Sequence, residues 1–145
     1  MDGDYKIDDE LSLFTVSKTD KFYSPANKNL YDEKEKDIFR HEQNLIISEK
    51  QAVLIMGCGH AGVVNIMQKA EKYRPCFCIG GSHLFNPFTR KSVSKELLDD
   101  IVMELQKYKD TKFYTCHCTG KTAFDYLSHH MNNIYYISCG ETVEI

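Results

Sequence analysis

The stretch that decides the fold lies at residues 53–62 and reads VLIMGCGHAG. Its first four residues are apolar and include β-formers, so they predict a strand that runs into a glycine turn. A helix should follow over residues 61–73, where apolar side chains such as Ile66 and Ala70 form one stripe at helical spacing. A strand, a turn and a helix in this order make up one unit of an α/β sheet protein.

Most of the remaining chain repeats this alternation of short strands and helices. We expect further strands at residues 45–47, 76–79, 113–114, 134–137 and 142–145, and further helices that cover residues 97–105 and 121–131. Ser94 is placed to cap the first of these helices, because its hydroxyl can accept a hydrogen bond from an amide of the first turn. The predicted fold class is α/β (α+β), with a mixed sheet and about three helices.

Residues 1–48 differ from residues 49–145, because their charges are dense and their periodicity is weak. Residues 11–16 predict one strand, whereas residues 18–36 predict a long surface loop. Both parts are expected to belong to one partial domain that covers residues 1–145, since this length suits a single hydrophobic core.

The composition disfavours several classes of protein. The net charge is -3, and the Lys and Arg residues are scattered along the chain. This argues against a nucleic-acid partner, because proteins that bind nucleic acids usually carry a clustered basic surface. No apolar run approaches the roughly 18 residues of a membrane span, and residues 1–10 are acidic where a secretory signal is basic. We therefore expect a soluble, cytoplasmic protein without a membrane or nucleic-acid partner, whose six cysteines are reduced.

Three short motifs each place a histidine beside glycine just after a predicted strand. They lie at residues 57–62 (GCGHAG), 80–84 (GGSHL) and 116–120 (CHCTG), and their histidines are His60, His83 and His117. Ligand sites of sheet proteins concentrate at such strand ends, and an imidazole can bind a metal or move a proton. The three histidines are therefore candidates for one shared functional site.

The first motif also fits the G-x-G-x-x-G fingerprint of dinucleotide-binding proteins, through Gly57, Gly59 and Gly62. That fingerprint requires an acidic residue about 20 positions later, where this chain has CIGGS at residues 78–82. His60 would also stand where a pyrophosphate must approach the backbone. Nucleotide binding is therefore the weaker alternative.

The cysteines offer two further alternatives. Cys76, Cys78, Cys116 and Cys118 carry the donor atoms of a zinc site, but zinc knuckles usually place at least two residues between paired cysteines. A nucleophilic Cys116 or Cys118 activated by His117 is disfavoured, because adjacent residues of an extended chain point in opposite directions.

Four motifs taken together resemble one family. Their sequences are DIFRHEQNL at residues 37–45, GCGHAGVVNI at residues 57–66, GGSHL at residues 80–84 and CHCTG at residues 116–120. In order and spacing they resemble the branch of metallo-β-lactamase-fold, metal-dependent hydrolases that is similar to dihydropterin-ribofuranosylaminobenzene phosphate synthase. The resemblance implies an αββα sandwich, of which this chain is the C-terminal half.

The resemblance also implies a chemistry. Enzymes of this family hold one or two divalent metal ions, with zinc expected first and iron or manganese as alternatives, and a metal-bound hydroxide attacks a phosphate-containing or ester substrate. By the resemblance, His60 serves the first metal ion and His117 the second. His83 would contact the small-molecule substrate or support the metal ligands, and no further catalytic residue is assigned.

The chain departs from the family in one respect, because it lacks the His-x-His-x-Asp-His motif that supplies most of the metal ligands. The implied metal site is incomplete, so we expect little or no turnover from the chain alone. The alternative is a non-catalytic remnant or subunit that completes its fold with an N-terminal half or as a homo-oligomer, and it predicts an exposed apolar sheet face. The role of His41 stays open.

Overall fold

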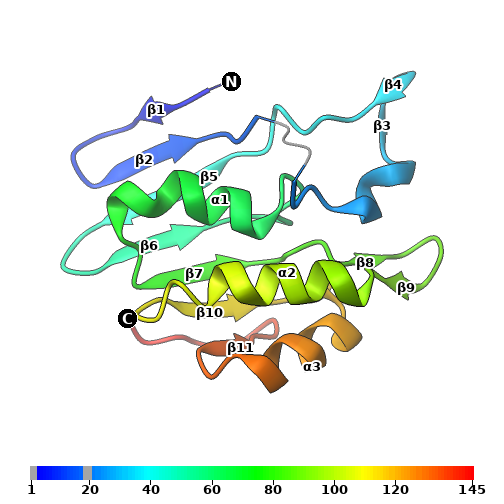
Figure 1. Cartoon of the computed structure of the whole chain (residues 1–145). Coiled ribbons are helices and arrows are strands. Elements are labelled where there is room, and N and C mark those ends of the chain that lie inside the picture. The colour runs from blue at the N-terminus through cyan, green and yellow to red at the C-terminus, as the bar shows by residue number, and fades with distance from the viewer. Residues whose placement is uncertain (1–2, 18–20) are drawn as a thin grey trace.

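The computed structural model describes residues 3–17 and 21–145, and its main element is a seven-stranded mixed sheet (Figure 1). In spatial order the strands are β1 (Tyr5–Lys6), β2 (Leu11–Phe14), β5 (Asn44–Ser48), β6 (Ala52–Ile55), β7 (Phe77–Gly80), β10 (Lys112–Thr115) and β11 (Ile134–Tyr136). Pairing is antiparallel from β1 to β6 and parallel from β6 to β11. The predicted mixed sheet is therefore confirmed, with a half built from hairpins and a half built from β-α units.

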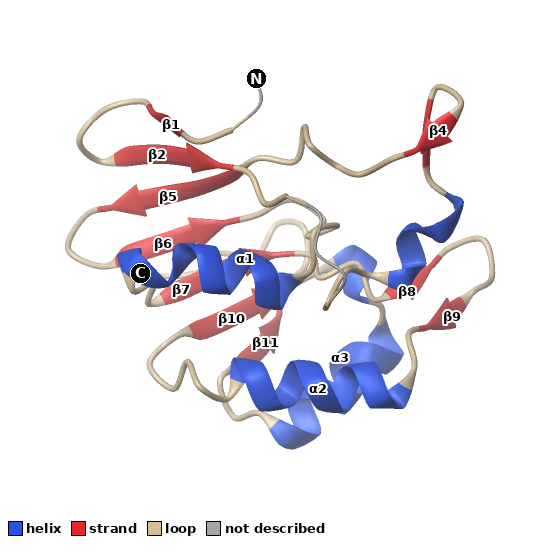
Figure 2. Ribbon diagram, turned by 45° about the horizontal axis from the view of Figure 1, so that its top comes forward, coloured by secondary structure: helices blue, strands red, loops and turns tan. Residues whose placement is uncertain are grey.

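The α-helices of the described chain cover one face of this sheet (Figures 1 and 2). They are α1 (Val63–Ala70), α2 (Lys95–Leu105) and α3 (Lys121–His130). The predicted cap of α2 is present, since the Ser94 hydroxyl accepts a hydrogen bond from Leu97 N at 3.3 Å. α1 ends earlier than predicted, because the chain continues as the 3-10 helix η2 (Glu71–Tyr73) and then takes a left-handed conformation at Arg74.

Residues on the helix-covered face form the core of the molecule. One row across the sheet joins Ile46, Leu54, Cys78, Phe113 and Ile134, and each of them is buried in the hydrophobic cluster that includes the helices. Full burial of a large apolar side chain contributes about 1.5–3 kcal/mol. This row, called here the covered face, therefore holds the helices on the sheet.

The opposite face of the sheet is also apolar but is partly accessible to solvent. Its row joins Leu13, Leu45, Ile55, Ile79, Tyr114 and Tyr135, called here the open face. Tyr135 is 41% exposed and the other five are half-buried. Two of its aromatic rings stack, since the ring centroids of Tyr114 and Tyr135 are 5.1 Å apart and the ring planes are 25° from parallel. The sheet thus presents apolar side chains on both of its faces.

The segment between β2 and β5 corrects one expectation. Residues 18–20 lie outside the described residues, but the rest of the expected surface loop contains regular structure. It includes the 3-10 helix η1 (Pro25–Asn29) and a small exposed hairpin of β3 (Tyr31–Asp32) and β4 (Glu35–Lys36).

Part of this segment is buried, which a surface loop is not. Ser24, Ala26 and Asn27 are each at most 5% exposed. The Ser24 hydroxyl caps η1 by accepting a hydrogen bond from Ala26 N at 3.2 Å, and Asn27 contacts the loop after β6. The segment is therefore a structural part of the strand edge where the three histidine motifs lie.

Two smaller differences concern the ends of strands. The prediction of a strand at residues 142–145 is wrong. The chain turns at Ser138 and Gly140 after β11, and the described residues beyond this turn have no strand structure. A short hairpin that the sequence did not indicate, β8 (Phe85–Asn86) with β9 (Lys91–Ser92), follows the second histidine motif.

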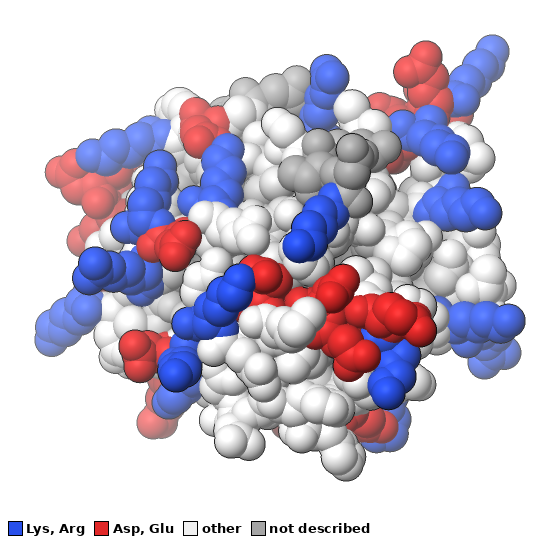
Figure 3. All heavy atoms as spheres, in the orientation of Figure 1, with Lys and Arg blue, Asp and Glu red and all other residues white. Residues whose placement is uncertain are grey.

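The outer surface of the helical layer is polar (Figure 3). Acidic side chains gather over α2, which contributes Glu96, Asp99, Asp100 and Glu104, and Lys and Arg side chains are distributed around them. None of the described helices is long and apolar enough to cross a membrane. The helices therefore present a polar surface to solvent, whereas the open face of the sheet presents apolar side chains.

Candidate metal centre

The three histidine motifs meet at one edge of the sheet. β6, β7 and β10 are neighbouring parallel strands, so the loops that follow them emerge at the same edge. Hydrogen bonds join these loops, because Gly81 N donates to Gly57 O at 2.8 Å and Ser82 N donates to Thr119 Oγ1 at 3.0 Å. The structure thus brings together the three loops that the sequence singled out.

Three glycines allow the chain to pack this closely. A Cβ at Gly59 would lie 2.6 Å from the carbonyl oxygen of Gly81, and a Cβ at Gly81 would overlap Cys118 Sγ. A Cβ at Gly62 would overlap the carbonyl oxygen of Phe22. Packing of the chain therefore accounts for Gly59 and Gly62 without a bound nucleotide, whereas a Cβ at Gly57 would meet nothing within 4 Å.

His60 is held by residues from the segment that precedes β5. Asn27 Nδ2 donates to the His60 carbonyl at 2.8 Å, and His60 Nδ1 lies 2.8 Å from Asn27 Oδ1. Phe39 stacks on the imidazole, with ring centroids 4.0 Å apart and planes 4° from parallel. Glu42 accepts hydrogen bonds from the amides of His60 at 2.7 Å and Ala61 at 2.9 Å. With Nδ1 donating to Asn27, Nε2 keeps its lone pair, which is how metal-binding histidines are commonly arranged.

His83 is buried beside His60, with 6% of its surface exposed and the two ring centroids 4.0 Å apart. Neither ring nitrogen of His83 has a hydrogen-bond partner at normal geometry among the described residues, although the nearby backbone of Ala26 acts to raise its pKa. Burial and, after it, the charge of His60 lower the pKa of His83 to about 4, so the ring is neutral at neutral pH. A buried polar side chain of this kind has ring nitrogens available to a further group.

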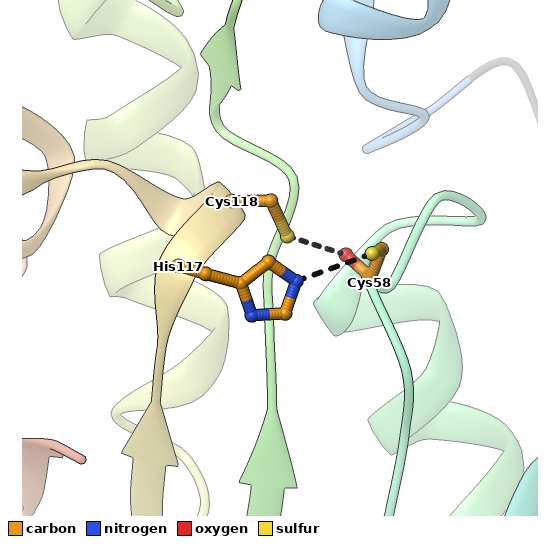
Figure 4. A group of neighbouring side chains, drawn as sticks. All are labelled: Cys58, His117 and Cys118. Atoms are coloured by element: carbon orange, nitrogen blue, oxygen red, sulfur yellow. Dashed lines mark hydrogen bonds between the residues drawn. The ribbon is translucent and has the colours of Figure 1, made fainter. Parts of the chain in front are cut away.

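His117 begins the 3-10 helix η3 (His117–Thr119) and is exposed. Its Nδ1 lies 3.0 Å from Cys116 Sγ, and its Nε2 lies 3.3 Å from Cys58 Sγ. Cys118 Sγ donates to the Cys58 carbonyl at 3.4 Å (Figure 4). One ligand atom from each of Cys58, His117 and Cys118 lies within 4.8 Å of the other two, and no other group of three such residues does so in the part of the chain that is described.

Two thiols at this edge, those of Cys116 and Cys118, favour their protonated form. Burial raises the pKa of Cys118 to about 12 and also raises the pKa of Cys116, and in both cases a neighbouring thiolate at Cys58 acts in the same direction. A bound cation reverses this preference, because it stabilises the thiolate and displaces the proton.

The structure bears on both cysteine alternatives. The disfavoured zinc site at Cys76, Cys78, Cys116 and Cys118 is not formed among the described residues, because Cys78 is buried in the core, where burial raises its pKa to about 12, and of these four only Cys118 belongs to the group described above. Adjacent side chains at this position also do not simply point apart, since η3 bends the chain and brings the Cys116 thiol to the ring of its neighbour His117.

The other histidines lie away from this edge or at its rim. The side chain of His41 is 68% exposed, and its Nδ1 lies 4.0 Å from Asp37 Oδ1. His129 and His130 are exposed at the end of α3. The structure therefore separates His129 and His130 from the pair formed by His60 and His83, whereas His41 lies beside Phe39, with ring centroids 5.9 Å apart.

Sequence reasoning missed four residues of this site: Asn27, Phe39, Glu42 and Cys58. Three of them lie inside motifs that were already singled out, so a signal for them existed. Asn27 offered none, because it stands in a segment without periodicity, and only its contact with His60 reveals its role.

Comparison with other sequences gives two partial matches, and no family model matches the chain. Both relatives are proteins of Methanocaldococcus jannaschii. One is an uncharacterized protein, 32% identical over 96 residues, which are 66% of this chain and 34% of that protein. The other is 7,8-dihydropterin-6-methyl-4-(beta-D-ribofuranosyl)-aminobenzene-5'-phosphate synthase, 32% identical over 79 residues, which are 52% of this chain and 25% of that protein. The matches thus span about a third or less of these relatives.

Comparison with solved structures identifies the fold. The crystal structure of a metal-dependent hydrolase of the β-lactamase superfamily matches with a TM-score of 0.77 at 22% sequence identity, and the match covers 100% of this chain and 57% of that chain. The chain therefore has a fold of the metallo-β-lactamase type, which confirms the predicted resemblance and fold class. The structural match also includes the residues before position 37, where the resemblance in sequence begins.

Proposed function

We propose that this chain, which has a metallo-β-lactamase-type fold, is the histidine-bearing part of a metal-dependent hydrolase that acts on a small phosphate-containing or ester substrate. The observation that carries the proposal is the pair of imidazoles at the strand edge. Asn27 orients His60, and His83 is buried without a hydrogen bond of normal geometry to the described residues. Burial lowers the pKa of both histidines, so both rings offer lone pairs at neutral pH.

The residues present fit a divalent metal ion, because neutral imidazole nitrogens are ligands that zinc, iron and manganese sites use. In this proposal His60 holds the first metal ion and His117 the second. His83 is close enough to both for their charges to act on its pKa, which suits a group that contacts the substrate beside the metals. A bound metal ion supplies the nucleophile by lowering the pKa of its water.

The chain's own residues prepare this site before any metal ion binds. Asn27 fixes the tautomer of His60, Phe39 fixes the plane of its ring, and Glu42 anchors its loop through two backbone amides. A hollow of about 470 Å³ beside His117 has room for a small substrate, and it is lined by Cys116, His117, Tyr136, Ile137, Ser138 and Cys139.

We further propose that a polypeptide segment outside these residues completes the site. The chain corresponds to 57% of the similar hydrolase and lacks the His-x-His-x-Asp-His motif, so further metal ligands must come from elsewhere. The open face supports this proposal, because half-buried apolar side chains form a continuous row there that a second sheet can cover. The occupant is a polypeptide that carries the missing motif. A non-catalytic subunit is the second candidate function, favoured by the same face.

The first test is the metal content per chain, measured by elemental analysis of the purified protein. We expect near-stoichiometric metal in the natural chain and loss of that metal in the His60→Ala, His117→Ala double variant. The matched control is the His129→Ala, His130→Ala variant, which removes two exposed histidines from the end of α3 and should keep its metal. Metal-free natural protein, or equal metal in both double variants, would contradict the proposal.

The second test is turnover of a chromogenic phosphodiester and a chromogenic ester in the presence of zinc, iron or manganese. We expect little or no metal-dependent hydrolysis by the chain alone, because two histidines do not make the three-ligand site of a catalytic zinc ion. Hydrolysis should appear when a polypeptide with the missing motif is added. Efficient hydrolysis by the chain alone would show that no partner is required.

A further inference from the structure

We propose that Cys58, His117 and Cys118 form a thiolate-containing zinc site at the strand edge, separate from the pair formed by His60 and His83. The three side chains come from the loops after β6 and β10 and point toward one another (Figure 4). His117 also belongs to the proposed hydrolase site, but the two cysteines do not. The zinc site can therefore be tested through Cys58 and Cys118 whether or not the proposed function is correct.

The spacing of the donor atoms fits one zinc ion. In tetrahedral geometry, with Zn–S and Zn–N distances of about 2.3 and 2.0 Å, a sulfur and a nitrogen ligand lie about 3.5 Å apart and two sulfur ligands about 3.8 Å apart. Cys58 Sγ and His117 Nε2 are 3.3 Å apart, and the ligand atoms of the three residues all lie within 4.8 Å of one another. These separations are within about 1 Å of those around a single zinc ion.

Neighbouring groups hold these donors in position. Cys118 Sγ lies where a Cβ at Gly81 would stand, so the thiol fills a space that only glycine leaves. Cys116 Sγ lies 3.0 Å from His117 Nδ1, and a proton on Nδ1 that is directed at this sulfur leaves Nε2 for the metal. Cys116 is therefore a positioning residue for the site.

The donor set selects the class of metal. Two thiolates and one imidazole favour zinc over magnesium, calcium or manganese, which prefer oxygen ligands. Binding converts two thiols to thiolates and releases their two protons to solvent. Three protein ligands leave the fourth tetrahedral position for water, a substrate or a residue of a partner. His117 is exposed and Cys58 is half-buried, so this position can be reached from solvent.

The test uses Co²⁺ as a spectroscopic probe for zinc, because thiolate ligands give Co²⁺ a near-ultraviolet charge-transfer band that imidazole ligands do not. The full chain, kept reduced with a phosphine, is titrated with Co²⁺ and then with Zn²⁺. We expect a stoichiometric band that Zn²⁺ abolishes. Cys58→Ser and Cys118→Ser should each remove most of the band and weaken zinc binding by more than about 100-fold, since loss of a direct ligand should exceed the loss of a supporting group.

Two control variants make the test specific. Cys139→Ser removes an exposed thiol outside the group and should keep the band. His60→Ala should also keep the band, because His60 is not one of the three donors. The metal content of this single variant reports on the hydrolase site alone, whereas the double variant removes His117 from both sites. Circular dichroism establishes that each variant is folded, which matters most for Cys118 because it is packed against Gly81. A folded natural chain without the band, or a band that persists in both ligand variants, would overturn the proposal.

Discussion

The two faces of the sheet are similar in composition but differ in burial. Along β6 and β7, Leu54 and Cys78 on the covered face are at most 1% exposed, whereas their chain neighbours Ile55 and Ile79 on the open face are half-buried. Sheets that meet water on one side usually alternate apolar with polar residues. A sheet with apolar residues on both faces is suited to being covered on both faces. In the described chain the helices cover one face.

Thiol modification should give the largest contrast between the covered face and an exposed surface. Burial raises the pKa of Cys78 to about 12, whereas Cys139 is exposed. Because the thiolate is the reactive form, we expect Cys78 to be alkylated more than about 1,000-fold more slowly than Cys139 at a pH of about 8. Peptide mapping by mass spectrometry after timed alkylation measures both rates. Similar rates would mean that the covered face opens readily.

Truncation of one apolar side chain on each face gives the next contrast. Leu54→Ala should lower the free energy of unfolding by about 3 kcal/mol, because it leaves a cavity in a fully buried site. Ile79→Ala should lower it by about 1 kcal/mol, because this side chain is only half-buried. Urea denaturation of the isolated chain at low concentration measures both. Equal losses would show that the open face is already covered in the isolated chain.

A charged residue introduced on the open face should weaken self-association of the chain, and this should be the smallest of the three effects. We expect the natural chain to self-associate at high concentration through this face, and Ile79→Lys to weaken that association about tenfold, which corresponds to about 1.4 kcal/mol. Met103→Lys is the matched control, since Met103 is 58% exposed on α2 at the helical side. Light scattering across a concentration series measures association. A natural chain that stays monomeric throughout would count against the proposed role of the open face.

The elements with strong local patterns could be predicted from the sequence. Short apolar runs predict the strands at residues 45–47 and 53–56, and capping predicts the helix after Ser94. The structure contains these elements as β5, β6 and α2. Residues 142–145 show the limit of such reasoning. Their β-forming residues favour a strand locally, but a strand requires a hydrogen-bonded neighbour, and the turn after β11 provides none among the described residues.

The site could be predicted only where its geometry follows from the sheet. Loops after parallel strands meet at one edge whatever their sequence, so the meeting of the three histidine motifs was foreseeable. The contacts of Asn27 and Glu42 with His60 span 33 and 18 positions of the chain, and no local periodicity encodes them. The approach of Cys58 to His117 depends on loop packing around Gly81, which residue types alone do not specify.

The segment between β2 and β5, which positions His60, is anchored at both ends by neighbouring strands, because β2 and β5 pair with each other. Pairing of β2 with β5 therefore closes a long loop, at an entropic cost that grows only slowly with loop length. Because non-local closures of this kind are slow steps in folding, the outer strands govern when Asn27 reaches His60 during refolding. The site at His60 should thus become able to bind metal only once β2 and β5 have paired.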